Sequence, residues 1–275
     1  MAYNGTAKET EPNTWLHLNG TADQILDRYC VSELVRGWPL YVDYSEWKNY
    51  RACFADDAWV LTLCSGGSQP IDNFVKNSQT GRKNGVFMAH RELGTLVDLN
   101  PSTNRAVGKM KVTITQRFID PSTKIEYDVD CDARFIMYCL KTPAPANTGS
   151  PVPGTGLGPR ANSGGWKIQY VKLIYEKDKV VSVDGKTVPT FPKEELDQYP
   201  YAHRYLAAAR ARQGEHPRKD MPTLIETEQF WNMYHAIDEW LNGQDVKKTL
   251  GIRVDVYKYG ALTGTRDCDR YLNLA

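Results

Sequence analysis

The sequence predicts an α+β fold in which a long, curved antiparallel sheet wraps around N-terminal helices as a cone and encloses one interior cavity. Helical patterns occupy most of residues 21–84, and β-rich segments separated by turn residues follow from residue 86 to residue 183. Beyond residue 184 the pattern becomes helical again. We therefore expect a helical C-terminal extension, packed on the same domain or on a neighbouring subunit.

The composition bounds the organisation and the partners. With 275 residues, 41% of them hydrophobic, the chain can form an arm (1–20), one main domain (21–183) and an extension (184–275). The net charge of +1 and the lack of a Lys/Arg-rich run argue against a nucleic-acid partner. No apolar run approaches the roughly 20 residues that span a bilayer, and the N-terminus lacks a signal-like apolar core, so we expect a cytoplasmic protein without membrane contact.

The cysteines do not suggest a metal site or a disulfide framework. They form no CxxC motif and no Cys/His cluster with metal-ligand spacing. We expect reduced, mostly buried thiols. The six are Cys30, Cys53, Cys64, Cys131, Cys139 and Cys268.

The first helix begins at a capping box, in which Thr21 caps the free amides and Gln24 reaches back to the cap. Apolar residues at helical spacing then continue to about Arg36. Gly37 and Pro39 are typical of a helix end, so we expect the helix to stop there.

A second, short helix is expected from a cap at Ser45 through Phe54. The acidic pair Asp56 and Asp57 is interpreted as the end of that helix. A strand over residues 58–64 follows, because its residues are mainly apolar.

A third helix and four long strands complete the main domain. Pro70 suits the first helical position of the helix, which Gly81 frays. In the third strand apolar residues alternate with charged ones such as Asp130 and Arg134, so one face lines the core and the other is wet or contacts another subunit. The strands are expected at residues 86–99, 105–118, 124–141 and 166–183.

Two less regular regions interrupt or follow this sheet. Residues 142–165 are rich in Pro, Gly, Ser and Asn, which predicts a flexible insertion that is either a flap over the pocket or a tolerated surface loop. In the extension, residues 192–213 and 223–242 have helical patterns, and residues 254–275 suggest a short strand and a tail.

One carboxylate and one histidine carry the chemical hypothesis. Asp43 stands between the first two helices, and His90 stands near a strand start. A carboxylate that accepts a hydrogen bond from an imidazole orients the ring and raises its pKa towards neutrality, which suits general acid–base catalysis. Taken singly, Asp43 could be a helix cap and His90 a semi-buried structural histidine. The remaining histidines are interpreted as structural: His17, His203, His216 and His235.

The element order and the segment from Trp47 through the FADDA motif (residues 54–58) resemble the SnoaL/NTF2-like superfamily over residues 21–183. The contexts YVDYSEW and FMAHRELG also resemble the Asp–His pair of the scytalone dehydratase branch. Other site positions of that branch are replaced here by Met110, Ala133 and Phe135, which argues against a direct dehydratase copy.

The chain is more similar to the fungal cofactor-independent hydroxybenzoate decarboxylases, whose motif has a Trp five residues before the Asp, a second Trp in the first strand, and a later His. Trp38, Asp43, Trp59 and His90 match this order. The resemblance implies conversion of protocatechuate to catechol and of gallate to pyrogallol without a catalytic cofactor. It also implies a homotrimer with a structural potassium ion, whose ligands the sequence does not assign.

In this hypothesis His90 donates a proton to the ring carbon that bears the carboxylate, Asp43 supports His90, and Trp38 and Trp59 clamp the substrate. Further candidates for contact with the phenol or the carboxylate are Tyr41, Tyr44 and Thr62. Two alternatives stay open. One is a dehydratase or cyclase acting on an aromatic polyketide, and the other is a non-catalytic NTF2-like binding module.

Overall fold

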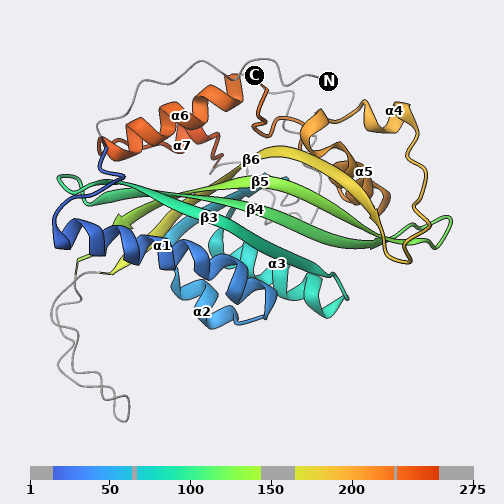
Figure 1. The fold of residues 1–275 in the computed structure, drawn as a ribbon, viewed down its shortest axis with the longest axis horizontal. Helices are drawn as coiled ribbons and strands as arrows, with labels where there is room; N and C mark the ends of the chain where they lie inside the picture. Colours follow the sequence, from blue (N-terminus) through green and yellow to red (C-terminus); the bar gives the residue numbers. More distant parts are fainter. Residues whose placement is uncertain (1–14, 64–66, 144–164, 226–227, 254–275) are drawn as a thin grey trace, which may run out of the picture.

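A computed structural model describes residues 15–63, 67–143, 165–225 and 228–253. Figure 1 shows a curved sheet with helices on both of its faces. The predicted arm, most of the predicted insertion, and the strand and tail predicted for residues 254–275 lie outside the described residues.

Six strands form one sheet in the order β2-β1-β6-β5-β4-β3. The long strands β3 to β6 pair antiparallel in sequence order, which confirms the predicted meander. The short β2 pairs antiparallel with β1, whereas β1 lies parallel to β6, a pairing that local sequence patterns do not reveal. The strands are β1 (Phe54–Thr62), β2 (Gly67–Pro70), β3 (Met88–Asn100), β4 (Arg105–Ile119), β5 (Glu126–Lys141) and β6 (Trp166–Ser182).

Helices cover both faces of this sheet. Figure 1 shows α6 and α7 on the side opposite α1, α2 and α3. The α5 helix shares the concave face with α1, since it hydrogen-bonds Gln116 of β4, whose side chain lies on the same face as Met110 by strand alternation. The helices are α1 (Ala22–Asp43), α2 (Trp47–Ala52), α3 (Ile71–Lys83), α4 (Lys193–Leu196), the 3₁₀ helix η1 (Tyr201–His203), α5 (Arg204–Arg212), α6 (Glu228–Leu241) and α7 (Lys247–Leu250).

The first helix is longer than predicted. Its capping box forms as expected, but it passes through Gly37 and Pro39 and ends at Asp43, so the predicted end near Arg36 is wrong. A proline inside a helix costs about 3 kcal/mol. Burial of this stretch, including Trp38 at 3% exposure, offsets that cost, because the residues beyond Arg36 pack against the sheet.

The prediction for the second helix and the following strand also needs correction. The α2 helix ends at Ala52 and β1 begins at Phe54, so Asp56 and Asp57 lie within the strand and are exposed there. The pairing of β1 with β6 shifts register between Phe54 and Trp59, where the acidic pair lies. Irregular strand geometry lets both carboxylates reach solvent. The two neighbouring carboxylates therefore suggested the end of a helix, whereas they lie in a strand with irregular pairing.

Two cap predictions are wrong in detail. Ser45 has a positive φ of 63° and does not cap α2, whose first flanking residue is Glu46. Pro70 flanks α3 rather than occupying its first turn, and the helix continues through Gly81 to Lys83. The helices themselves are present where expected.

Gly108 of β4 marks a close approach of α1 to the sheet. A Cβ atom at this position would lie 2.4 Å from Cγ2 of Val35, which is fully buried. We expect Gly108→Ala to lower the free energy of unfolding by about 1–3 kcal/mol because it overpacks this contact. Urea denaturation measures the loss. The double variant Gly108→Ala/Val35→Ala should be less destabilised than the sum of the two single variants, and simple additivity would contradict the steric explanation.

The convex face holds a second core under α6. The indole N–H of Trp240 donates to the carbonyl oxygens of Ala106 at 3.1 Å and Cys139 at 3.2 Å. The guanidinium of Arg105 lies 4.0 Å from the centroid of the same indole. Trp240 is 3% exposed. The α6 helix is therefore fixed to β4 and β5 by hydrogen bonds as well as by apolar contact.

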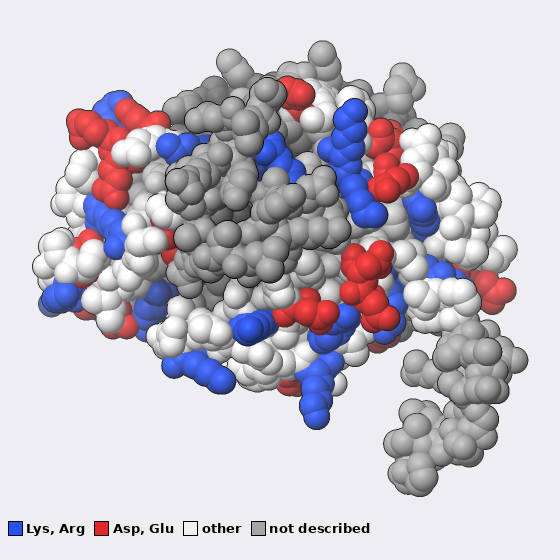
Figure 2. All heavy atoms as spheres, turned by 180° about the vertical axis from the view of Figure 1, so that it is seen from behind, with Lys and Arg blue, Asp and Glu red and all other residues white. Residues whose placement is uncertain are grey.

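Charged residues on the outward face of the strands neutralise each other. Asp128 of β5 accepts a hydrogen bond of 2.8 Å from Arg117, and Asp130 lies 3.8 Å from the ammonium of Lys179. Figure 2 shows the molecule from behind, where basic and acidic side chains intermingle over the described part of the surface. Over residues 126–134 the alternating sequence of β5 thus separates a buried face from a polar one, as predicted, whereas Ile136 and Tyr138 further along the outer face are buried under α6.

The described residues also bear on the expected thiols and on the expectation of no membrane-spanning segment. Cys30, Cys53, Cys131 and Cys139 are free thiols, and three of the four are buried. None of the described helices has the length and apolarity needed to cross a membrane.

Candidate functional site

His90 and Asp43 lie within hydrogen-bonding distance of each other. Asp43 is the last residue of α1, and His90 is the third residue of β3. The Nδ1 atom of His90 is 2.8 Å from Oδ1 of Asp43, and the backbone N–H of His90 donates to Oδ2 at 2.6 Å. The two side chains are only 3% and 15% exposed, respectively. One residue thus engages both carboxylate oxygens, which fixes the orientation of the imidazole.

Arg82 of α3 holds the two elements that carry this pair. Its guanidinium donates to the carbonyl oxygen of Asp43 at 2.8 Å and to that of Met88 at 3.0 Å. The end of α1 and the start of β3 are therefore joined by a single cation. Arg82 is a positioning residue, because it contacts the pair only through the backbone carbonyl oxygen of Asp43.

The other ring nitrogen of His90, Nε2, has no hydrogen-bond partner within the described residues. The imidazole packs edge-on against Phe135 of β5, with 6.0 Å between ring centroids. Its neighbour in the adjacent strand is Ile114. A nearly buried imidazole with one nitrogen anchored and the other unpaired beside apolar walls can pass a proton to or from a bound molecule.

Trp38 lies on the same aromatic wall. Its indole centroid is 5.0 Å from that of Phe135, whose ring also contacts His90. Tyr50 and Phe74 pack against the other sides of the indole at 5.3 and 5.4 Å. The structure therefore brings three of the predicted residues, Asp43, His90 and Trp38, to one region of the concave face.

Trp59 does not join them, so the prediction of a clamp made of two indoles around the pair is corrected. Trp59 belongs to the convex core with Tyr170 and Trp240, whereas Ala58 and Val60 face the concave core. Successive side chains of a strand point to opposite faces, so a shift of one residue decides which chamber a side chain enters.

The three further candidates are dispersed. Tyr44 is 77% exposed and follows the end of α1, and Tyr41 packs beside Gly37 on the side of α1 that faces Cys53. Thr62 ends β1 and is half-buried, on the concave side by alternation with Val60. None of the hydrogen bonds of the pair within the described residues involves these side chains.

A second group of buried ionisable residues, which sequence patterns gave no reason to single out, lies at the α5 end of the concave face. Asp178 of β6 accepts a hydrogen bond of 2.8 Å from the backbone N–H of Leu206, while its other oxygen is buried without a partner. Burial raises the pKa of Asp178 to about 7. Fully buried His203 packs on Tyr175, and burial lowers the pKa of its imidazole to about 4.

These shifts give opposite pH dependences. Because the folded-state pKa of Asp178 is about 7, above its usual value of about 4, its stabilising contribution is present at low pH and is lost as the pH rises towards 7. The depressed pKa of His203 instead removes stability as the pH falls from about 6.5 to about 4.

We expect Asp178→Asn, which keeps a helix-capping side chain, to be more stable relative to wild type at pH 8 than at pH 5. The asparagine does not ionise, so the variant does not carry the buried negative charge at high pH. Urea midpoints of both proteins at the two pH values test this. A constant difference between them would show that the carboxyl group does not titrate in this range.

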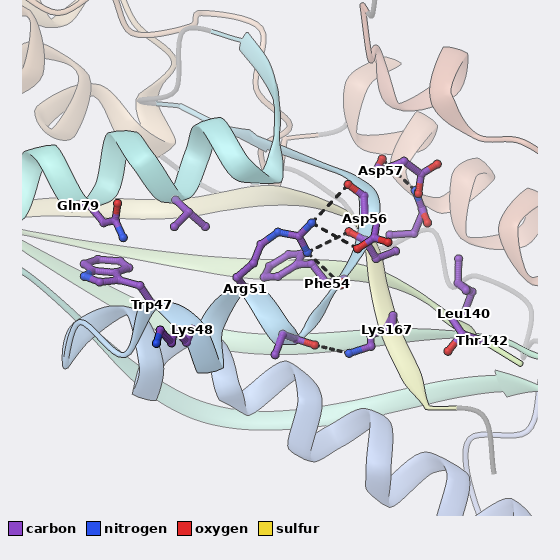
Figure 3. Close-up of a pocket in the computed structure, with 14 residues that line it drawn as sticks. Trp47, Lys48, Arg51, Phe54, Asp56, Asp57, Gln79, Leu140, Thr142 and Lys167 are labelled. Carbon is purple, nitrogen blue, oxygen red and sulfur yellow. Dashed lines mark hydrogen bonds and ion pairs between the residues drawn. The ribbon is translucent and has the colours of Figure 1, made fainter. Parts of the chain in front are cut away.

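A surface groove of about 1120 Å³ lies between α2, α3, β1 and β6, away from the pair. Figure 3 shows Arg51 pointing across it towards Asp56. The guanidinium of Arg51 lies 2.5 Å from the carboxylate of Asp72 and 3.6 Å from that of Asp56, and Lys167 donates to the carbonyl oxygen of Ala52. These cations are paired within the local framework, and the described residues that line the groove include no histidine, so the groove offers no imidazole for acid–base chemistry.

No group of three or more His, Cys, Asp or Glu side chains that could hold a metal ion occurs among the described residues. The potassium site implied by the resemblance therefore has no acidic side-chain cluster to which it can be assigned.

Comparison with known proteins identifies the family of this chain. An uncharacterized protein of Aspergillus terreus is 38% identical over 203 residues, covering 72% of this chain and 70% of its own. Pea pathogenicity protein 2 of Fusarium vanettenii is 31% identical and covers 86% of this chain and 95% of its own. Among solved structures, a hexachlorocyclohexane dehydrochlorinase of Novosphingobium barchaimii has a TM-score of 0.44 at 12% identity, covering 61% of this chain and 98% of that one. Residues 23–172 match the SnoaL-like domain, and the chain belongs to this family.

Proposed function

We propose that this protein is a cofactor-independent acid–base enzyme that decarboxylates small phenolic acids, with protocatechuate and gallate as substrates. One observation carries the proposal. His90 is anchored through Nδ1 to Asp43, and its Nε2 is unpaired within the described residues beside the aromatic wall of Phe135 and Trp38. This arrangement suits proton delivery to an aromatic ring held against that wall.

The reaction needs one proton and no redox step. An imidazolium at His90 gives its Nε2 proton to the ring carbon that bears the carboxylate, and a new C–H bond forms from a ring π pair. The phenolic oxygen para to that carbon supplies the electron density. The bond to the carboxylate then breaks, carbon dioxide leaves, and the bonding pair restores the aromatic ring. Asp43 stabilises the imidazolium before the transfer.

The apolar surroundings favour this direction. Loss of carbon dioxide converts a charged carboxylate into a neutral molecule, so an environment that solvates the carboxylate weakly lowers the barrier. Phe135 is 1% exposed and Trp38 is 3% exposed, so the wall beside His90 is apolar. The paired cations of the groove in Figure 3 would instead hold a carboxylate in its charged form.

Product formation from 3,4-dihydroxybenzoate and 3,4,5-trihydroxybenzoate tests the proposal. The purified protein should release catechol and pyrogallol, quantified by chromatography. Asp43→Asn should lower the rate by about 10²-fold or more. Asp23→Asn, which alters an exposed carboxylate near the start of the same helix, should leave the rate unchanged. Failure of the wild-type protein to release either product rules out the proposed reaction.

The position of Trp59 favours one other function, an elimination of water from an aromatic polyketide alcohol. The convex location of Trp59 removes one of the two indoles that the decarboxylase motif would place around the substrate. The same His90 and Asp43 could remove a proton and protonate a leaving hydroxyl. Loss of water from such an alcohol, dependent on His90 and without any catechol formation, would support this second function.

A further inference from the structure

Two hydrogen-bond donors in the aromatic cluster have no acceptor. The indole Nε1 of Trp38 and the phenolic oxygen of Tyr50 are both buried, and neither has a hydrogen-bond partner within the described residues. Their rings pack edge to face with 5.3 Å between centroids. Tyr50 is fully buried and comes from α2, whereas Trp38 comes from α1.

Such donors are costly to leave unpaired. A buried polar group without a partner loses its bonds to water and gains none in return, and most buried groups in proteins are therefore paired. A sequence that only needed to fill this space could use Phe at position 50 without that cost. Trp38 and Tyr50 come from different helices, their rings pack against each other, and Trp38 also packs on Phe135, the neighbour of His90. An acceptor from a bound molecule would complete both donors.

We infer that the Tyr50 hydroxyl and the Trp38 indole N–H bind one oxygen of the substrate, the ring oxygen para to the carboxylate, in its phenolate form. This inference rests on the proposed function. Trp38 and His90 both contact the ring of Phe135, and Tyr50 lies one ring contact further from His90. In this inference the substrate ring lies along the wall, with its carboxylate-bearing carbon at His90 and its para oxygen towards the two donors.

The donor chemistry selects the charge state of that oxygen. A neutral phenol must donate its own proton as well as accept, whereas a phenolate or a carbonyl oxygen only accepts. Burial raises the pKa of Tyr50 well above its usual value, so its hydroxyl stays a neutral donor. When the ring carbon is protonated, the para oxygen becomes the carbonyl oxygen of a dienone. Both donors can keep their hydrogen bonds to this oxygen, because it is an acceptor in both states.

Tyr50→Phe tests the inference because it removes the donor and keeps the ring. We expect kcat/KM for 3,4-dihydroxybenzoate to fall by about 10- to 100-fold, the range for a hydrogen bond to a charged oxygen. The folded state should be at least as thermally stable as wild type, since the oxygen is unpaired without substrate. Tyr127→Phe is the matched control: it removes another buried, unpaired hydroxyl, on a ring stacked against Phe118, and should leave kcat/KM unchanged.

A second readout does not depend on turnover. The chromogenic ligand 4-nitrocatechol absorbs differently as phenol and phenolate, so its spectrum reports the charge of the bound oxygen. Wild type and Tyr127→Phe should bind it as phenolate at a pH where it is mainly neutral in solution, and Tyr50→Phe should lose this shift. The same spectrum and the same kcat/KM in all three proteins would overturn the inference.

The two readouts separate the inference from the proposed function. Catechol release by wild type with no effect of Tyr50→Phe on either readout would leave the decarboxylase standing and remove the oxygen site. A Tyr50-dependent phenolate spectrum without any catechol release would support the oxygen site and remove the decarboxylase.

Discussion

His90→Asn should lower kcat/KM for the phenolic acid by about 10²- to 10⁴-fold, the contribution usual for a positioned proton donor. Asparagine can still donate a hydrogen bond to Asp43 from a similar place, but it carries no exchangeable acidic proton near neutral pH. The loss should therefore appear mainly in kcat. Initial rates of catechol release across a substrate series measure both constants.

His235→Asn is the matched control, because it changes an exposed histidine on α6, and its rates should equal those of wild type. The circular dichroism spectra of the three proteins should coincide. If His90→Asn keeps near-normal rates, His90 is not the proton donor. If wild type binds the acid without converting it, and His90→Ala binds equally well, the protein is a binding module.

Trp240→Ala should lower the free energy of unfolding by about 3–5 kcal/mol, the range for truncating a large buried aromatic side chain. The change removes the indole from the convex core and leaves the carbonyl oxygens of Ala106 and Cys139 without this donor. It also removes the ring beneath Arg105. Urea denaturation monitored by far-ultraviolet circular dichroism measures the loss.

His235→Ala, on the exposed side of the same helix, should change stability by no more than about 0.5 kcal/mol. A single cooperative transition that shifts as a whole would show that α6 and the sheet unfold together. If Trp240→Ala instead leaves the main transition in place, α6 does not contribute to the stability of the sheet.

The long strands were predictable because the alternation of apolar and polar residues is repeated many times along them. In β4 and β5 most apolar residues follow one phase, with Val107, Ile136 and Tyr138 as exceptions on the convex face, so the period and the ends are recovered to within a few residues. The proximity of Asp43 and His90 came from motif order rather than from periodicity. Arg82 also joins α1 to β3 through two carbonyl contacts, and no local pattern indicates that connection.

The errors have physical causes of their own. Pro39 is a strong local signal for a helix end, yet burial of α1 against the sheet outweighs its cost. Trp59 was assigned by its order in a motif, which does not fix the face of a strand. The unpaired state of Tyr50 and the buried carboxyl of Asp178 depend on helices that pack from distant parts of the chain, so composition and spacing give no sign of either.

The parallel pairing of β1 with β6 has a consequence for biosynthesis. Val60 and Leu61 of β1 pair with Val171 and Lys172 of β6, which are translated more than a hundred residues later. At about 5–20 residues per second, a ribosome needs several seconds to deliver that neighbour. During this interval the apolar edge of β1 is a target for chaperones or for self-association. Slow-translating stretches between the two strands should therefore lower the yield of native protein made in cells.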